Sequence, residues 1–95
     1  MSAVPEEQRA ILEIRNRLGL HARAAAQFVQ TASKFDAEVT VAKDDQVVNG
    51  RSIMGVMMLA AEQGSHIEVV VTGPQAAEAL QAIAALLEAR FNEVE

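Results

Sequence analysis

Two hydrophobic periodicities alternate along this chain, and their order restricts the fold more than any other feature of the sequence. Alternating apolar and polar residues are typical of half-buried strands, whereas apolar residues at i, i+3, i+4 and i+7 are typical of amphipathic helices. By these rules we predict strands at 9–16, 37–41, 46–49 and 67–71, and helices at 22–33, from Ser52 to Leu59 or Ala61, and from Gly73-Pro74 to Phe91.

The predicted order βαββαβα favours an α/β two-layer sandwich of the α+β class. The turn Lys43-Asp44-Asp45 joins the second and third strands into a hairpin, so the sheet should be mainly antiparallel with one face in solvent. The two longer helices would cover the other face. We expect residues 1–8 to be a flexible tail and residues 9–95 to form one domain.

Composition excludes several classes of function. The net charge of −5 argues against nucleic-acid binding, and no apolar run is long enough to span a bilayer. The absence of Cys and of a signal-peptide pattern fits a cytoplasmic protein. The two histidines lack the spacing of metal ligands, so we expect neither a metal nor another cofactor.

His21 lies at the junction of the first predicted strand and helix, in the run Gly19-Leu20-His21-Ala22-Arg23. Gly19 permits a tight turn, which places His21 where the first backbone N–H groups of the helix lack partners. Arg23 adds a cation at the positive end of the helix dipole, which a bound anion would compensate. An imidazole at such a site can carry a phosphoryl group. The alternative is a histidine that only caps or packs the helix.

The phosphate-binding groups expected here are the helix N–H groups from Ala22 onward and the Arg23 guanidinium, whose fork of donors matches phosphate oxygens. Arg17 is a weaker candidate. Either arginine could instead be an exposed residue without a ligand. His66 has no comparable surroundings in the sequence, and we expect it to be structural or solvated.

The segment from Arg51 to Leu59 is apolar nearly all round. One buried stripe is expected from Ile53, Val56, Met57 and Ala60, which leaves Met54 and Met58 on another face with Leu59 at its margin. Exposed methionines suit docking to several partners, whereas a buried core helix is the alternative. The candidate docking residues are Met54, Met57, Met58, Leu59 and Leu20.

Ser52 precedes this segment and has two interpretations. It is a good helix N-cap. It is also a hydroxyl beside Arg51 and the apolar segment, where phosphorylation would change the surface charge.

The motifs together resemble the histidine-containing phosphocarrier (HPr) family of the bacterial phosphoenolpyruvate-dependent phosphotransferase system, from Ile11 to Phe91. The matching runs are Gly19-Leu20-His21-Ala22-Arg23, Thr31-Ala32-Ser33-Lys34-Phe35 and Arg51-Ser52-Ile53-Met54-Gly55-Val56-Met57. The resemblance implies a four-stranded antiparallel sheet in the order 1-4-2-3 with the helices on one face.

The resemblance also implies roles for individual residues. His21 matches the histidine that is phosphorylated on Nδ1, and Arg23 matches the arginine of the active centre. Ser52 matches a serine that a regulatory HPr kinase/phosphorylase modifies in part of the family. The methionine-rich segment matches part of the surface that docks enzyme I and the enzyme IIA proteins.

Two features distinguish this chain within the family it resembles. Ala24 stands where Pro usually follows the active-site arginine, and we expect it to tune function modestly without abolishing it. Several runs, among them Met57-Met58-Leu59, are similar to the nitrogen-related branch called NPr, which regulates rather than serving chiefly in sugar uptake.

We therefore expect a monomeric phosphoryl carrier, not an enzyme, in which His21 accepts a phosphoryl group from enzyme I and passes it to an enzyme IIA protein. The carrier would serve sugar uptake or nitrogen and metabolic regulation. The alternatives are an interaction module without phosphotransfer and a small acylphosphatase-like phosphohydrolase, for which Asn49 could hold the water.

Overall fold

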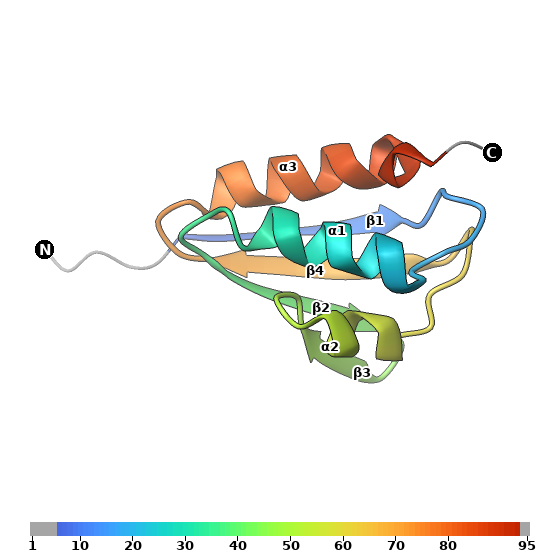
Figure 1. The fold of residues 1–95 in the computed structure, drawn as a ribbon. Helices are drawn as coiled ribbons and strands as arrows, with labels where there is room; N and C mark the ends of the chain where they lie inside the picture. The colour runs from blue at the N-terminus through green and yellow to red at the C-terminus, as the bar shows by residue number, and fades with distance from the viewer. Residues whose placement is uncertain (1–5, 94–95) are drawn as a thin grey trace, which may run out of the picture.

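The computed structural model describes residues 6–93, and this part of the chain contains four strands and three helices in the predicted order (Figure 1). The elements are β1 (Glu7–Glu13), α1 (Ala22–Ala32), β2 (Glu38–Lys43), β3 (Gln46–Asn49), α2 (Ile53–Met58), β4 (His66–Thr72), α3 (Ala76–Glu88) and the single turn η1 (Arg90–Asn92). Within residues 6–93 no helix is both long and apolar enough to cross a membrane.

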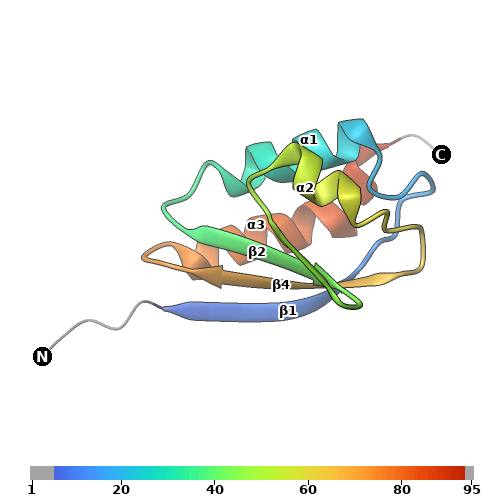
Figure 2. The ribbon, with the colours of Figure 1, turned by 90° about the horizontal axis from the view of Figure 1, so that it is seen from below.

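The four strands form one antiparallel sheet in the order β1-β4-β2-β3. All three helices lie on the same face of this sheet, as the view in Figure 2 shows. The predicted fold class and the order 1-4-2-3 are therefore confirmed.

The core lies between the sheet and the helices because apolar side chains alternate along the strands. On β4, Ile67, Val69 and Val71 are almost completely buried, while the residues between them are only partly buried. Phe28 of α1 and Ile83 of α3 pack onto this row from the helical layer. Burying each such side chain contributes about 1.5–3 kcal/mol, so the sheet and the two longer helices depend on each other.

The first strand begins earlier than predicted. Glu7 pairs with Thr72 across the sheet, and the Glu6 carbonyl accepts a hydrogen bond of 2.9 Å from the Gly73 N–H. The expectation of a flexible tail is therefore wrong for residues 6–8, because pairing with β4 continues to that point. The rest of the expected tail, residues 1–5, lies outside the described residues, as do residues 94–95.

Both β1 and α3 end before the predicted boundaries. β1 stops at Glu13 rather than at residue 16, and α3 stops at Glu88 rather than at Phe91. Phe91 is buried as predicted, but it reaches the core from η1, a turn whose residues have left-handed φ values of 54–57°.

A close backbone contact fixes the turn between β1 and α1. The Leu20 N–H donates to the Ala61 carbonyl over 2.9 Å, and Gly19 has a φ of +68°. A Cβ atom on Gly19 would lie 2.4 Å from the Ala61 oxygen. Glycine is thus required both by the dihedral angle and by the space.

We predict that Gly19→Ala lowers the free energy of unfolding by about 2–5 kcal/mol, because left-handed strain of roughly 1–2 kcal/mol adds to overpacking of roughly 1–3 kcal/mol. Gly64→Ala is the matched control: Gly64 also has a positive φ of +90°, but no atom lies within 4 Å of its added Cβ. Urea unfolding of both variants measures the difference, and equal losses would refute a specific role for the contact with Ala61.

Candidate functional site

His21 caps the N-terminus of α1 with its own imidazole. The backbone at His21 is extended (φ −71°, ψ 178°), and Nδ1 accepts a hydrogen bond from the Arg23 N–H over 3.3 Å. The first bond within the helix runs from the Ala25 N–H to the His21 carbonyl. The imidazole therefore lies against the end of the helix where N–H groups lack intrahelical partners, as the sequence predicts.

The two ring nitrogens of His21 have different surroundings. Nε2 lies 2.5 Å from Oε2 of Glu93, while Nδ1 faces the backbone of α1. An ionised carboxylate can only accept a hydrogen bond and the Arg23 N–H can only donate one. These partners assign the proton to Nε2 and leave the lone pair on Nδ1. In the neutral ring, Nδ1 is thus the nitrogen that carries the lone pair.

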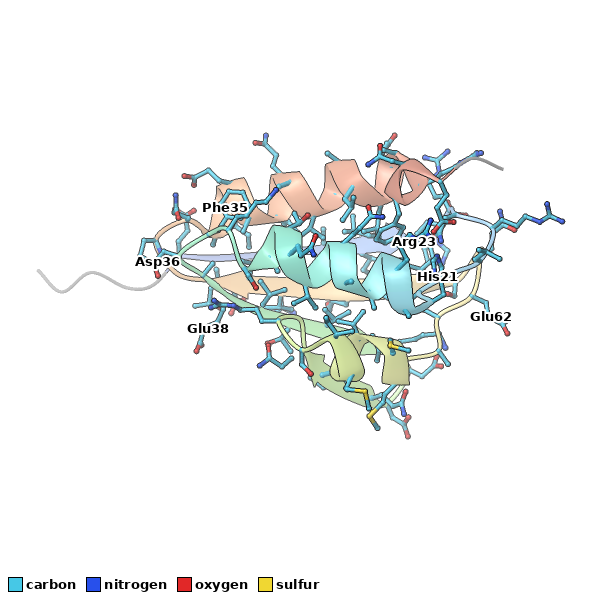
Figure 3. All side chains as sticks on the ribbon, viewed as in Figure 1. His21, Arg23, Phe35, Asp36, Glu38 and Glu62 are labelled. Carbon is cyan, nitrogen blue, oxygen red and sulfur yellow. The ribbon has the colours of Figure 1, made fainter. Side chains whose placement is uncertain are left out.

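His21 is among the residues that line an open pocket of about 1070 Å³. Its lining brings together the predicted residues Arg17, Ala22 and Arg23 with His21. His21 and Arg23 lie at one end of α1, and Phe35 lies near the other end (Figure 3). The remaining residues that line the pocket are Leu18, Gln27, Phe91, Asn92 and Glu93. The pocket is far larger than a phosphoryl group, so it has room for side chains of a partner.

Two residues of the site were missed from the sequence. Glu93 contacts His21 across 72 positions of the chain, and Asn16 donates from Nδ2 to both carboxylate oxygens of Glu93 over 3.2 and 3.3 Å. The local signal was Asn16 itself, a polar residue at the end of the predicted strand 9–16, which the structure buries completely.

The candidate docking residues divide into two groups. Four large apolar side chains of α2 are exposed, by 38–70%, and we call them the methionine patch: Ile53, Met54, Met57 and Met58. Leu59 and Leu20 are only 2% and 4% exposed, so the prediction that they dock partners is wrong.

The predicted buried stripe of α2 is correct at Val56, which is completely buried, and wrong at its other three positions. Ile53, Met57 and Ala60 are exposed, and Leu59 is buried instead. The prediction failed there because α2 is short. A helix of six residues has too few apolar positions for a periodic pattern to indicate which face is buried.

The other candidates occupy separate places. Ser52 caps α2, and its Oγ accepts a hydrogen bond from the Gly55 N–H over 3.1 Å. His66 is exposed at the start of β4, opposite Glu13. Ala24 is completely buried in the first turn of α1. Among residues 6–93, no group of three or more His, Cys, Asp and Glu side chains could hold a metal ion.

The sequence matches known phosphocarrier proteins over most of its length. The family described as "PTS HPr component phosphorylation site" matches residues 8–89. The phosphocarrier protein HPr of Neisseria meningitidis is 54% identical over 84 residues, which cover 88% of this chain and 94% of that protein. The HPr of Xylella fastidiosa is 51% identical over 82 residues, or 86% and 92% of the two chains.

Solved structures agree with this match. The structure of HPr-C-His from Thermoanaerobacter tengcongensis superposes with a TM-score of 0.88 at 44% identity, covering 93% of this chain and 99% of that one. The HPr of Bacillus anthracis gives a TM-score of 0.80 at 43% identity, covering 83% and 94%. The chain therefore belongs to the HPr family, whose members are phosphocarrier proteins of the phosphotransferase system and not enzymes that turn over a substrate.

Proposed function

We propose that Nδ1 of His21 accepts a phosphoryl group from enzyme I and passes it to an enzyme IIA protein. The observation that carries this proposal is the asymmetry of the ring: Nε2 is occupied by Glu93, whereas Nδ1 faces the N-terminus of α1 in the pocket with Arg17 and Arg23.

Transfer to His21 is a substitution at phosphorus. The Nδ1 lone pair forms the new P–N bond while the P–N bond of the donor phosphohistidine breaks and its electron pair returns to the donor ring. The Nε2 proton stays in place, so the His21 ring gains positive charge. Such a transfer depends mainly on positioning and on electrostatic stabilisation.

The N-terminus of α1 and the two arginines would supply that stabilisation. When Nδ1 turns to phosphorus, its bond with the Arg23 N–H is lost and this N–H becomes available to a phosphoryl oxygen, together with the N–H of Ala22. The guanidinium groups of Arg23 and Arg17, which line the same pocket, would bind the remaining negative charge.

The methionine patch would dock both partners. It carries no charged residue, α2 packs against α1, and in Figure 1 the C-terminal end of α2 lies toward the end of α1 that holds His21. Methionine side chains adapt to differently shaped surfaces, which suits a carrier that must meet a donor and an acceptor in turn.

The alternatives have less support. Asn49, which an acylphosphatase-like enzyme would need for its water, does not line the His21 pocket, and its Oδ1 accepts from the Arg51 N–H over 2.8 Å. A pure interaction module would not need the two different environments of the imidazole nitrogens.

The physiological branch is tested by the acceptor. Transfer from the phosphorylated chain to a nitrogen-type enzyme IIA and to a sugar-type enzyme IIA can be compared under the same conditions. Faster transfer to the nitrogen type would favour the regulatory role that the NPr-like runs indicate, and faster transfer to the sugar type would favour uptake.

We predict that His21→Ala abolishes phosphorylation, because no other histidine lies at a helix N-terminus. His66→Ala is the matched control and should be phosphorylated at the wild-type rate. Acid-labile phosphate is measured after incubation with phosphoenolpyruvate and enzyme I, and circular dichroism checks folding. Phosphohistidine on the His21→Ala variant would show that His21 is not the carrier.

Arg23→Ala should slow phosphoryl transfer about 10- to 100-fold, since one charge-assisted hydrogen bond contributes about 1.5–3 kcal/mol. Arg15→Ala removes the same charge nearby, but Arg15 pairs with Glu88 at 3.5 Å outside the pocket, so this control should transfer normally. Rapid-quench kinetics with enzyme I measures both variants. Equal rates for the two would leave Arg23 without a role in transfer.

Ser52→Asp should raise the apparent KM for the carrier without lowering stability. Asp is as good an N-cap as Ser, but its charge lies beside the methionine patch, which must lose water on docking. Phosphorylation of Ser52 by an HPr kinase/phosphorylase would have the same effect with more charge.

Ser52→Ala is the crossed control for this variant. It should lose about 1 kcal/mol of stability with the cap and leave the KM unchanged. If Ser52→Asp transfers as well as the wild type at low concentration, the methionine patch is not the docking surface.

A further inference from the structure

A buried asparagine and the C-terminal turn together hold a carboxylate against the ring of His21. The side chain of Glu93 is only 10% exposed, and that of His21 is 28% exposed. Asn16 is completely buried; its Nδ2 donates to the Gly19 carbonyl over 2.7 Å and to Glu93. One amide group therefore ties the carboxylate to the turn that precedes His21.

We propose that Glu93, held by Asn16, is a positioning residue for phosphoryl transfer: it keeps the proton of His21 on Nε2 and Nδ1 ready to attack. This inference rests on the proposed function of His21 as the carrier. In other proteins, a carboxylate that accepts a hydrogen bond from one nitrogen of a reactive histidine fixes the tautomer and the ring orientation in the same way.

The charge that develops during transfer gives Glu93 a second effect. When Nδ1 bonds to phosphorus and the proton remains on Nε2, the ring becomes cationic. The Glu93 carboxylate lies 2.5 Å from Nε2 in a poorly solvated position. Its negative charge therefore stabilises the cationic ring, and the carboxylate does not have to move to do so. The same contact acts in the reverse step, in which the phosphoryl group leaves for the acceptor.

The backbone around Glu93 is specialised for this placement. Arg90, Phe91 and Asn92 have φ values of 55°, 54° and 57°, a left-handed conformation that asparagine tolerates but that is unfavourable for Arg90 and Phe91. Phe91 is 1% exposed, and its burial fixes the turn that brings Glu93 to His21. Strained backbone of this kind persists where the surroundings determine it, and it clusters at functional sites.

Asn16 is a second place where the local structure is energetically unfavourable. Its Oδ1 atom is buried and has no hydrogen-bond partner among the described residues. Rotating the amide would not help, because the Gly19 carbonyl and the Glu93 carboxylate are both acceptors and need the NH₂ group. An unsatisfied buried acceptor is unfavourable, so the asparagine fits better as a clamp for Glu93 than as a packing residue.

The tautomer of His21 can be measured directly in the full chain. In ¹⁵N spectra of protein labelled at histidine, above the pH at which the ring is protonated, His21 of the wild type should carry its proton on Nε2. Glu93→Gln should give a mixture of tautomers, because a neutral amide can donate as well as accept. The signals of His66 serve as the internal reference in each spectrum and should not change.

Transfer kinetics supply the second readout. Glu93→Gln should lower the maximal rate of transfer from enzyme I about 10- to 100-fold, as expected for one charge-assisted hydrogen bond, with little change in KM. Glu88→Gln is the matched control, because it removes the same charge from an exposed side chain of α3. Asn16→Leu, of similar size, should change tautomer and rate in the same direction.

The outcomes separate this inference from the carrier function. A wild-type ring protonated on Nδ1, or a Glu93→Gln variant with unchanged tautomer and rate, overturns the positioning role and leaves His21 as the carrier. A wild-type chain that gains no phosphate on His21 overturns the proposed function instead. The tautomer measurement needs no phosphorylation, so it stands even then and still decides whether Glu93 holds the proton on Nε2.

Discussion

The close approach of the Gly19 turn to the Ala61 backbone is the contact on which the site depends. It joins the end of β1, the start of α1 and the connection from α2 to β4 at one point. Leu20 fills the core beside that point, so the chain enters α1 in one direction only. The position of the His21 backbone therefore comes from backbone packing, while the contact between Nε2 and Glu93 bears on the orientation of the ring.

A carrier must bind a phosphoryl group well enough to accept it and loosely enough to release it. The His21 pocket is lined by side chains of opposite charge: Arg17 and Arg23, and Glu93, which contacts the imidazole. In the proposed function the arginines would attract the phosphoryl oxygens, whereas the Glu93 carboxylate would stabilise the cationic ring that holds the group. Attraction by the arginines and repulsion by Glu93 would together keep the free energies of the free and the phosphorylated forms close. Transfer in both directions requires that neither form is strongly favoured.

Sequence reasoning succeeded where the determinants are local and failed where they are not. The strands and α1 were predicted because their periodicities extend over enough residues, and the placement of His21 and Arg23 at the start of α1 was predicted because one turn joins them. The buried face of α2 was predicted correctly only at Val56, because six residues define no clear period. Glu93 and Asn16 were missed because 77 positions separate them, and no local pattern indicates that a left-handed turn at Phe91 brings them together.

The separation of charge and apolar surface on one side of the molecule suggests how a single carrier meets different proteins. The methionine patch has no charge, so, if it docks partners as proposed, its contribution to binding would come from buried area and would tolerate differences between partners. In the proposed function, the arginines and the helix end would act on the phosphoryl group, which is the same whichever partner supplies it. The transfer chemistry would then be separate from docking, and a charge added at Ser52 would affect docking while it leaves the chemistry of His21 intact.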